Sequence, residues 1–392
     1  MVKLQKKFDQ LLNDLENLKG TESFYDYEES FTHLLKDFGR ELLESSLGEP
    51  VENRKKKRGI QTGYGKIELN KSHEYSEQIE SAKVSPYLQG KLIFIGQFSC
   101  YDNGEEIANR LLEIKTNDTA IYRLTDTMGE EVGEWIDEQD RYDIEQIENK
   151  DRVYCQVDGS NLLTRRPGWK EVKLGRVFKQ SSILPESADR QWIRKSEYVG
   201  HFGDHEEFET KISVLLDEYS GLKDRLVFVN DGAVWIENWI TAEYPDATQI
   251  LDFYHAIENV SKYANVCITN KKVRKEWISQ TASLLKEKGY KSLIERIDEL
   301  KCNTKLKKEV KRKLMVYLKR NRTRMDYPSY IAKGLLIGSG AIEAAHRNVL
   351  QKRMKLSGQR WSTRGIQNMI NLRVINKSGH WDMITNKLRR AA

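Results

Sequence analysis

The sequence contains few of the residues that cross-link small domains or bind zinc. Only four of its 392 residues are cysteines, and no two of them form a Cys-x-x-Cys pair. The sequence therefore predicts neither a disulfide framework nor a zinc ribbon, and it is typical of a reducing cytoplasm. It also lacks a run of about 18 apolar residues, so we expect no membrane span. Its polar amino terminus does not have the pattern of a signal peptide.

Charged residues are plentiful but unevenly distributed. Lys and Arg total 65 against 59 Asp and Glu, which leaves a net charge of +6. The segment from Glu258 to Met325 alone holds 20 basic and 7 acidic residues, an excess of +13. Such a segment can bind a polyanion even though the whole chain is nearly balanced. The length of the chain favours two or three domains.

The first part of the chain predicts helices and a basic hairpin. Residues 1–47 have the apolar spacing of amphipathic helices, which fits a packing or dimerisation module and, less well, direct DNA contact. Residues 48–82 predict a β-hairpin. It opens with five successive cations that form either a solvated loop or a phosphate-contacting edge: Arg54, Lys55, Lys56, Lys57 and Arg58.

Residues 83–150 predict three helices. A short helix, a turn and a further helix are compatible with a helix-turn-helix, whose recognition helix reads bases from its first turns. The residues in those turns would be Thr119, Tyr122 and Arg123. A small helical packing domain explains the pattern equally well.

From residue 151 the composition shifts to strands. Apolar strands are predicted at 153–157, 170–183, 198–202, 226–229 and 249–253, with helices before and after the fourth. This β–β–β–α–β–α–β order is that of a ribonuclease-H-like sheet, so we expect the first part of an α/β core at 151–256. Residues 257–332 predict a basic all-α insertion. Residues 333–392 predict a core helix followed by C-terminal helices.

Three carboxylates occupy comparable positions in this pattern. Asp158 and Asp231 each follow an apolar strand and precede a glycine, which lets the backbone turn. Glu343 lies in the first turn of a predicted helix after Gly-Ser-Gly. Together on one sheet edge, they would be hard oxygen ligands suited to two Mg²⁺ (or Mn²⁺) ions, which can activate a nucleophile and stabilise the leaving oxygen of a phosphodiester. Singly, each is as easily a turn former or a helix-terminal carboxylate.

Several motifs in fixed order resemble insertion-sequence transposases of the ISKra type. The motifs are QVDGS at 156–160, GWKEVKLG at 168–175, NDGA at 230–233, ILDFYH at 250–255 and GSGAIE at 338–343. The resemblance implies a bacterial DDE enzyme with Asp158, Asp231 and Glu343 as its catalytic, metal-binding triad. The spacing of 112 positions between Asp231 and Glu343 is too long for a minimal core, which implies the all-α insertion.

The resemblance also implies function and partners. The protein would bind the terminal inverted repeats of its own element through its mainly helical N-terminal region. It would then cleave the transposon ends and join the freed 3′-hydroxyls to target DNA, as a homo-oligomer on paired ends in the bacterial nucleoid. The alternatives are a ribonuclease-H-like nuclease that only hydrolyses, and a catalytically silent, transposase-derived DNA-binding protein.

Two further motifs carry open alternatives. Asp252 and His255 match an Asp-or-Cys-x-x-His signature that follows the second Asp in several transposase superfamilies, but a buried pair that braces a strand to a helix explains them too. Arg360 and Trp361 could stack on a base or flank the cleavage site. A Trp in this setting more often belongs to the core.

Overall fold

The computed structural model is a mixed α/β structure, and it describes residues 2–18, 23–48, 57–77, 79, 83–137, 151–166, 168–187, 190–219 and 224–390. Contacts divide the chain into two compact units: Met1–Val132 together with Gly379–Ala392, and Gly133–Ser378. Among the described residues, no helix combines the length and the apolar character that crossing a membrane requires.

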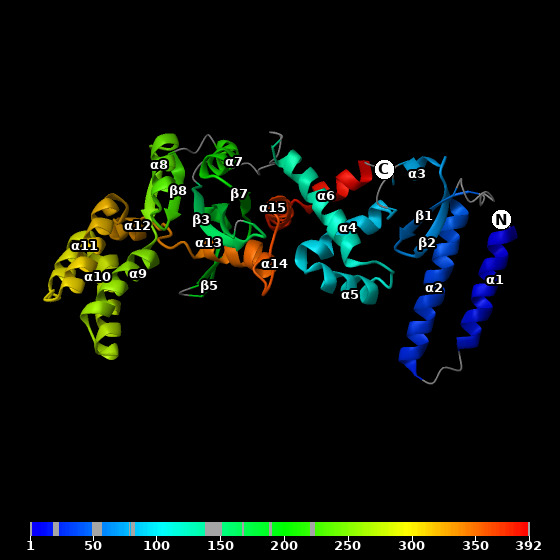
Figure 1. Ribbon diagram of the computed structural model, residues 1–392, viewed down its shortest axis with the longest axis horizontal. Helices are drawn as coiled ribbons and strands as arrows, with labels where there is room; N and C mark the ends of the chain where they lie inside the picture. Colours follow the sequence, from blue (N-terminus) through cyan, green and yellow to red (C-terminus); the bar gives the residue numbers. More distant parts are fainter. Residues whose placement is uncertain are drawn as a thin grey trace. The chain divides into compact units, whose positions relative to one another are not determined.

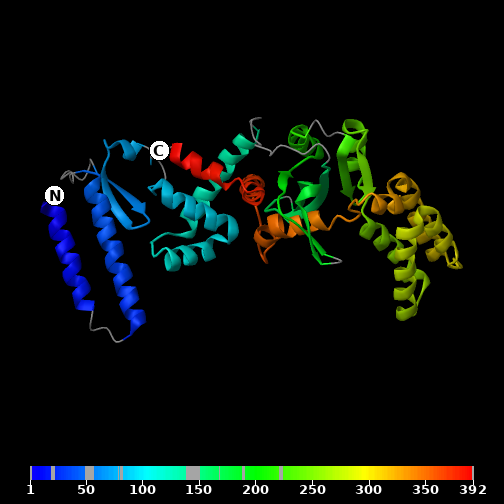
Figure 2. The same cartoon turned by 180° about the vertical axis from the view of Figure 1, so that it is seen from behind.

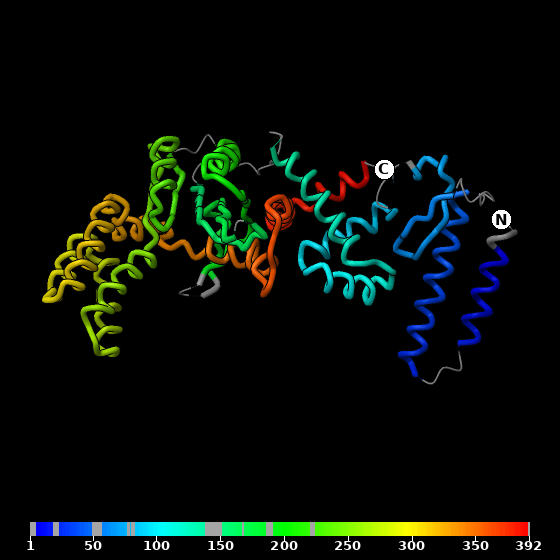
Figure 3. Tube along the Cα trace, in the orientation of Figure 1, coloured from blue at the N-terminus to red at the C-terminus, as the bar shows by residue number. Residues whose placement is uncertain are grey.

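The first unit consists of helices around one hairpin. Helices α1 (Val2–Asn17) and α2 (Phe24–Ser46) run side by side (Figure 3). The predicted hairpin is present as β1 (Lys57–Thr62) and β2 (Gly65–Asn70), and its inward face packs against α2. The remaining helices of this unit are α3 (Glu74–Glu77), α4 (Pro86–Phe98), α5 (Tyr101–Leu111), the greater part of α6 (Asp118–Asp137) and α16 (Trp381–Arg390). The three helices predicted at 83–150 are therefore confirmed as α4, α5 and α6.

The second unit is organised around a five-stranded sheet with the order β7-β4-β3-β8-β9. Figure 1 labels β3, β7 and β8 of this sheet. The strands are β3 (Val153–Leu163), β4 (Trp169–Lys179), β7 (Glu197–Phe202), β8 (Leu226–Asn230) and β9 (Thr248–Leu251). Strand β4 is antiparallel to both β3 and β7, whereas β3, β8 and β9 are parallel. Every residue of β8 is buried, as expected of a parallel strand covered on both faces.

Each face of the sheet has its own apolar core because side chains alternate along a strand. Val153, Cys155 and Val157 of β3 point to one face, where they pack with helices α7 (His205–Asp217) and α8 (Val234–Glu243). Tyr154 points to the other face and joins a core with the helices that follow β9. These are α9 (Phe253–Cys267), α10 (Lys271–Asp298), α11 (Lys305–Arg320) and α12 (Tyr327–Ala332), which Figure 2 shows grouped together.

The chain returns from these helices to the sheet through a helical segment with an irregular centre. It comprises α13 (Gly340–Ala345), a π-helix (His346–Gln351) and α14 (Lys352–Met354), followed by α15 (Thr363–Ser378). The sequence predicted one continuous helix from 341 to 355. The interruption has a tertiary cause, because the buried Arg373 of α15 donates hydrogen bonds to the carbonyls of Asn348 and Val349.

Three predicted boundaries were wrong. The strand at Asp158 does not end there, because β4 pairs with β3 as far as Leu163. The strand predicted at 170–183 ends at Lys179, and Ile183 begins a separate hairpin of β5 (Ile183–Ser187) and β6 (Arg190–Ile193). Phe253 begins α9 instead of ending a strand, because Asp252 caps that helix.

Close packing of α15 on β7 depends on Gly200. A methyl group at this position would lie 2.4 Å from Cγ2 of Ile370 and 3.3 Å from Cγ1 of Val374. We expect Gly200→Ala to lower the free energy of unfolding by about 1–3 kcal/mol, the usual effect of overpacking a core. Denaturant titration followed by circular dichroism measures it.

The matched control is Gly340→Ala in the same unit, where an added methyl group meets nothing within 4 Å. Equal unfolding midpoints for the two variants would contradict this account of the β7–α15 contact.

Candidate active site

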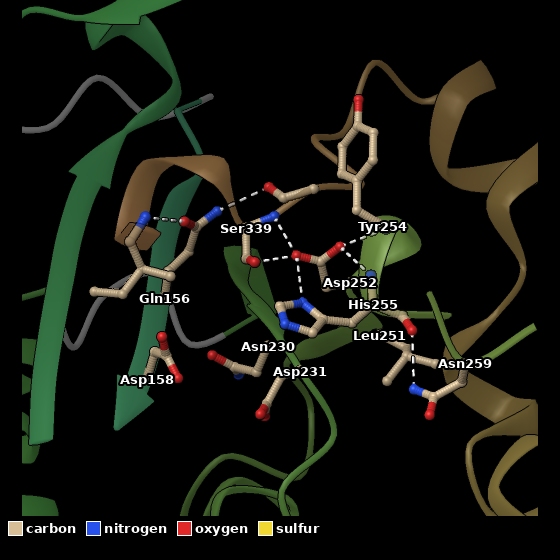
Figure 4. Close-up of polar contacts among 12 residues, drawn as sticks. Gln156, Asp158, Asn230, Asp231, Leu251, Asp252, Tyr254, His255, Asn259 and Ser339 are labelled. Atoms are coloured by element: carbon tan, nitrogen blue, oxygen red, sulfur yellow. Dashed lines mark hydrogen bonds and ion pairs between the residues drawn. The ribbon is translucent and has the colours of Figure 1, made fainter. Parts of the chain in front are cut away.

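The register of the parallel strands places Asp158 beside Asp231. Val153 pairs with Leu226 and Cys155 with Phe228, and the same offset continued along both strands brings the two aspartates opposite each other. Adjacent strands are about 4.8 Å apart. The side chain of Asn230 maintains this alignment, since its Oδ1 accepts a hydrogen bond of 2.8 Å from the backbone N–H of Val157. Figure 4 shows Asp158 on its strand and Asp231 close by, directly after the neighbouring strand.

The pKa of Asp158 is shifted by its burial and by the neighbouring carboxylates. Burial raises the pKa of Asp158 to about 6, and the neighbouring Asp231 and, more weakly, Glu343 act in the same direction. The N–H of Gly159, which donates to Asp158 Oδ1 at 2.7 Å, opposes the shift. Asp231 Oδ1 accepts from the N–H of Ala233 at 2.9 Å. The charges of Asp231 and Glu343 therefore both act on Asp158, and a bound cation would relieve this repulsion.

Glu343 is brought to the sheet by contacts that hold the start of α13. Gln156, two residues before Asp158 on β3, accepts a hydrogen bond from the N–H of Ile342 at 3.0 Å. Its amide also donates to the carbonyl of Gly338 at 3.2 Å. From β4, the buried Arg176 donates to the carbonyl of Ala341 at 2.8 Å. Neither positioning residue was predicted from the sequence, although a glutamine inside an otherwise apolar strand was an available signal.

Asp252 is fully buried and joins three segments (Figure 4). Its Oδ1 accepts from the backbone N–H groups of Tyr254 and His255 at 2.6 and 3.2 Å, which caps α9. Its Oδ2 accepts from both the N–H and the hydroxyl of Ser339, just before α13. Nδ1 of His255 lies 3.3 Å from the same oxygen, close enough for an ion pair although the ring N–H is not aligned for a hydrogen bond. These contacts favour the bracing role over direct ligation.

The contact between Asp252 and His255 stabilises the charged form of both side chains. Burial alone would raise the pKa of Asp252, but interactions with His255 and Ser339 outweigh it and lower the pKa below the ordinary range. The contact with Asp252 raises the pKa of His255 to about 9, despite partial burial of the ring. His255 is therefore an imidazolium at neutral pH, with no lone pair for a metal ion.

Two sets of side chains, which share Glu343, place possible metal ligands near one another. Among the residues that the structure describes, Asp252, His255 and Glu343 present ligand atoms within 4.8 Å of one another. However, both oxygens of Asp252 already accept hydrogen bonds from Tyr254, His255 and Ser339, which leaves this set few free lone pairs for a divalent cation. Asp158 and Asp231, with Glu343 nearby, are all hard oxygen donors, which is the chemistry that Mg²⁺ or Mn²⁺ prefers.

Two basic residues near Asp158 were not predicted. His346 is buried with its Nε2 3.5 Å from Asp158 Oδ2. Burial lowers the pKa of His346 to about 4, with Lys355 acting in the same direction and the Asp158 backbone carbonyl against it. Lys355 donates a hydrogen bond to the hydroxyl of Ser160. No local pattern in the sequence predicts that His346 and Lys355 lie near β3, because this proximity arises only from tertiary packing.

The predicted DNA-contacting residues differ in their surroundings. Arg54, Lys55 and Lys56 lie outside the described residues. Lys57 forms an ion pair with Glu68 at 2.7 Å, and the Arg58 guanidinium donates to the backbone carbonyls of Ser76 and Ile79. The residues at the start of α6 are exposed: Thr119, Tyr122 and Arg123.

Arg360 and Trp361 lie at the far end of β3. Arg360 is exposed, whereas the Trp361 indole N–H donates to the carbonyl of Met354 at 3.1 Å. The backbone N–H of Trp361 donates to Leu163, and the Arg353 guanidinium lies 5.0 Å from the indole ring centre. These contacts favour a packing role for Trp361.

The hairpin also carries a basic pocket that the sequence did not reveal. Lys66, Lys71 and Lys83 join Lys57 and Arg58 around a cavity of about 660 Å³. Lys83 reaches it because its carbonyl accepts a hydrogen bond from the N–H of Gln61 in β1. Within the described part of the chain, no carboxylate lies within 4.0 Å of the amino groups of these three additional lysines.

Fold and site together define an α/β protein with carboxylates gathered on one edge of a mixed sheet. The model of an uncharacterised protein family, UPF0236, matches residues 157–387. The match covers more than half of the chain, so the chain belongs to this family, which is often found in bacterial mobile-element proteins. No curated protein matches it.

The ion pair of Asp252 and His255 makes stability depend on pH. The folded-state pKa of His255, about 9, lies above its ordinary value of 6.5, so its stabilisation is complete below pH 6.5 and is lost as pH rises through 9. We expect a loss of roughly 1–2 kcal/mol, allowing for solvent screening of a side chain that is 35% exposed. Denaturant titrations at pH 6 and pH 10 measure the difference.

In His255→Gln, which cannot titrate, this component of the pH dependence should disappear. An identical loss between pH 6 and pH 10 in the variant and the unaltered protein would show that the pair does not contribute.

Proposed function

We propose that the protein is a DDE transposase that cleaves the ends of its element and joins them to target DNA. The observation that carries the proposal is the alignment of Asp158 in β3 with Asp231, which directly follows the adjacent parallel strand β8, with Glu343 held nearby by Gln156 and Arg176. The raised pKa of Asp158, which is caused first by burial and then by the charge of Asp231, supports it, because carboxylates with perturbed pKa values are typical of functional sites.

The arrangement of the sheet supports a ribonuclease-H-like core. The first three strands of this sheet along the chain form an antiparallel meander, and β8 and β9 extend it on the β3 side as parallel strands. Helices α10, α11 and α12 lie in the sequence between β9 and α13 and would form the all-α insertion. The basic excess of this segment would face the phosphates of DNA.

Asp158 and Asp231 would hold the metal ions, and Glu343 would complete the second position. Two bound Mg²⁺ (or Mn²⁺) ions supply activation of the attacking oxygen and stabilisation of the leaving oxygen. Asp252 keeps α9 and the start of α13 together, and the imidazolium of His255 places a positive charge beside the carboxylates. Lys355, next to Ser160, is positioned to contact a non-bridging phosphate oxygen of the substrate.

DNA binding is assigned to three surfaces. The basic pocket of Lys57, Arg58, Lys66, Lys71 and Lys83 would bind backbone phosphates. The exposed start of α6 would read bases in the terminal inverted repeats. The insertion would bind phosphates near the cleavage site. Work on paired transposon ends requires at least two protomers, so we propose a homo-oligomer on DNA in the bacterial nucleoid.

Removing one carboxylate tests the reaction. Asp231→Ala, Asp158→Asn and Glu343→Gln should each lower strand transfer by roughly 10²–10⁴-fold, because a lost metal ligand removes several kcal/mol of transition-state stabilisation. The assay uses duplexes carrying the DNA that flanks the gene, a supercoiled target plasmid and Mg²⁺.

Asp246→Ala is the matched control, since Asp246 is an exposed aspartate of the same unit between α8 and β9. Wild-type joining by Asp231→Ala would refute the assignment. Products that are cut but never joined would instead identify a hydrolytic nuclease.

The basic pocket predicts a particular salt dependence. Replacing Lys66, Lys71 and Lys83 together by Gln should weaken DNA binding. The slope of log affinity against log salt concentration should become shallower by about 2–3, because each lost phosphate contact releases roughly one counterion fewer. Fluorescence anisotropy with a short labelled duplex, repeated over a range of salt concentrations, gives the slope.

Lys6→Gln on α1 provides a control at an exposed lysine outside the pocket. A slope unchanged in the triple variant would place the phosphate contacts elsewhere on the protein.

A further inference from the structure

His346 is a buried histidine whose contacts are incomplete. Its side chain is 3% exposed, and its Nε2 lies 3.5 Å from Oδ2 of Asp158, slightly beyond hydrogen-bond distance. Neither ring nitrogen makes a hydrogen bond of good geometry, although the backbone carbonyl of Asp158 also lies close enough to act on the ring. A buried donor without a partner costs about 1–3 kcal/mol. A shift of a few tenths of an ångström would satisfy Nε2.

The backbone around His346 is held in place from the opposite side. His346 begins the π-helix directly after α13, three residues after Glu343. Such widened turns occur frequently at functional sites. Here the carbonyls of Asn348 and Val349 within the turn accept hydrogen bonds from the buried guanidinium of Arg373. These hydrogen bonds hold the backbone that carries the imidazole next to Asp158.

The two oxygens of Asp158 face different groups. Oδ1 accepts the N–H of Gly159 at 2.7 Å, whereas Oδ2 faces His346. A donor at each oxygen determines the rotation of the carboxylate and leaves the remaining lone pairs directed away from both donors. Fixing that rotation is the usual role of groups that hydrogen-bond a metal-ligating carboxylate.

We propose that His346 is a positioning residue for Asp158. Its Nε2–H donates a hydrogen bond to Asp158 Oδ2 and fixes the carboxylate in the orientation that binds the metal ion. This inference rests on the proposed function, in which Asp158 is a metal ligand. The competing explanation is a histidine that only fills space in the core. The two differ in the tautomer of the ring and in the effect of its removal on metal affinity.

The tautomer can be measured on the unaltered, metal-free protein. In ¹⁵N spectra of protein labelled at its seven histidines, with His346→Gln used for assignment, we expect the His346 ring to carry its proton on Nε2 at neutral pH. Asp158→Asn should shift that resonance. A proton on Nδ1, or a resonance indifferent to Asp158→Asn, would overturn the proposal whether or not any variant folds.

Metal affinity gives the second measurement. Titration with Mn²⁺, followed by electron paramagnetic resonance, should show binding weakened by about 10–100-fold in His346→Leu, the usual effect of losing such a partner. His346→Gln retains a side-chain N–H and should recover part of the affinity. His33→Leu is the control, at an exposed histidine of α2. Wild-type affinity in a folded His346→Leu would overturn the proposal.

The outcomes separate this proposal from the one on which it rests. If the unaltered protein and Asp158→Asn bind Mn²⁺ equally, Asp158 is not a ligand, and the proposed function and the positioning role both fail. If Asp158→Asn loses Mn²⁺ but His346→Leu does not, the metal site stands and only the role of His346 is refuted.

Discussion

The buried carboxylate of Asp252 is the contact on which the rest of the site depends. Placing an isolated carboxylate in the protein interior costs several kcal/mol, and a partner removed from such a group is strongly destabilising. Asp252 is satisfied only when α9 begins directly after β9 and when Ser339 returns beside it, 87 residues later. The position of α13, and with it Glu343, therefore depends on how the intervening helices fold back to the sheet.

Aspartate serves two different purposes in this site, one at Asp252 and the other at Asp158. Asp252 has all its oxygens engaged and a lowered pKa, so it is a structural anion. Asp158 is half-buried, has Asp231 as its neighbour and has a raised pKa, so its charge is poorly stabilised by the protein alone. The difference arises from hydrogen-bond donors: Asp252 receives several, whereas Asp158 receives one well-formed backbone donor. An anion left without compensation is a suitable ligand for a cation.

Much of the local structure could be predicted from the sequence. Apolar runs located β8 and β9, and the glycine after Asp231 marked the end of β8, whose last residue is Asn230. The same argument failed at Asp158, because a glycine does not end a strand whose neighbour continues to pair with it. The basic run before residue 59 drew attention to the hairpin. Yet Arg58 is committed to backbone carbonyls, and the free cations of the pocket are Lys66, Lys71 and Lys83, scattered in sequence.

Local periodicity and turn chemistry by themselves determined the order of most strands and helices, because these depend on residues within a few positions of one another. They also indicated which carboxylates stand at strand ends and helix starts. Only the tertiary structure decided that Asp158 and Asp231 share one register, that Gln156 and Arg176 hold α13, and that His346 and Lys355 lie next to β3. Those contacts join residues 73 to nearly 200 positions apart. Their geometry follows from packing two cores on one sheet, which no local pattern encodes.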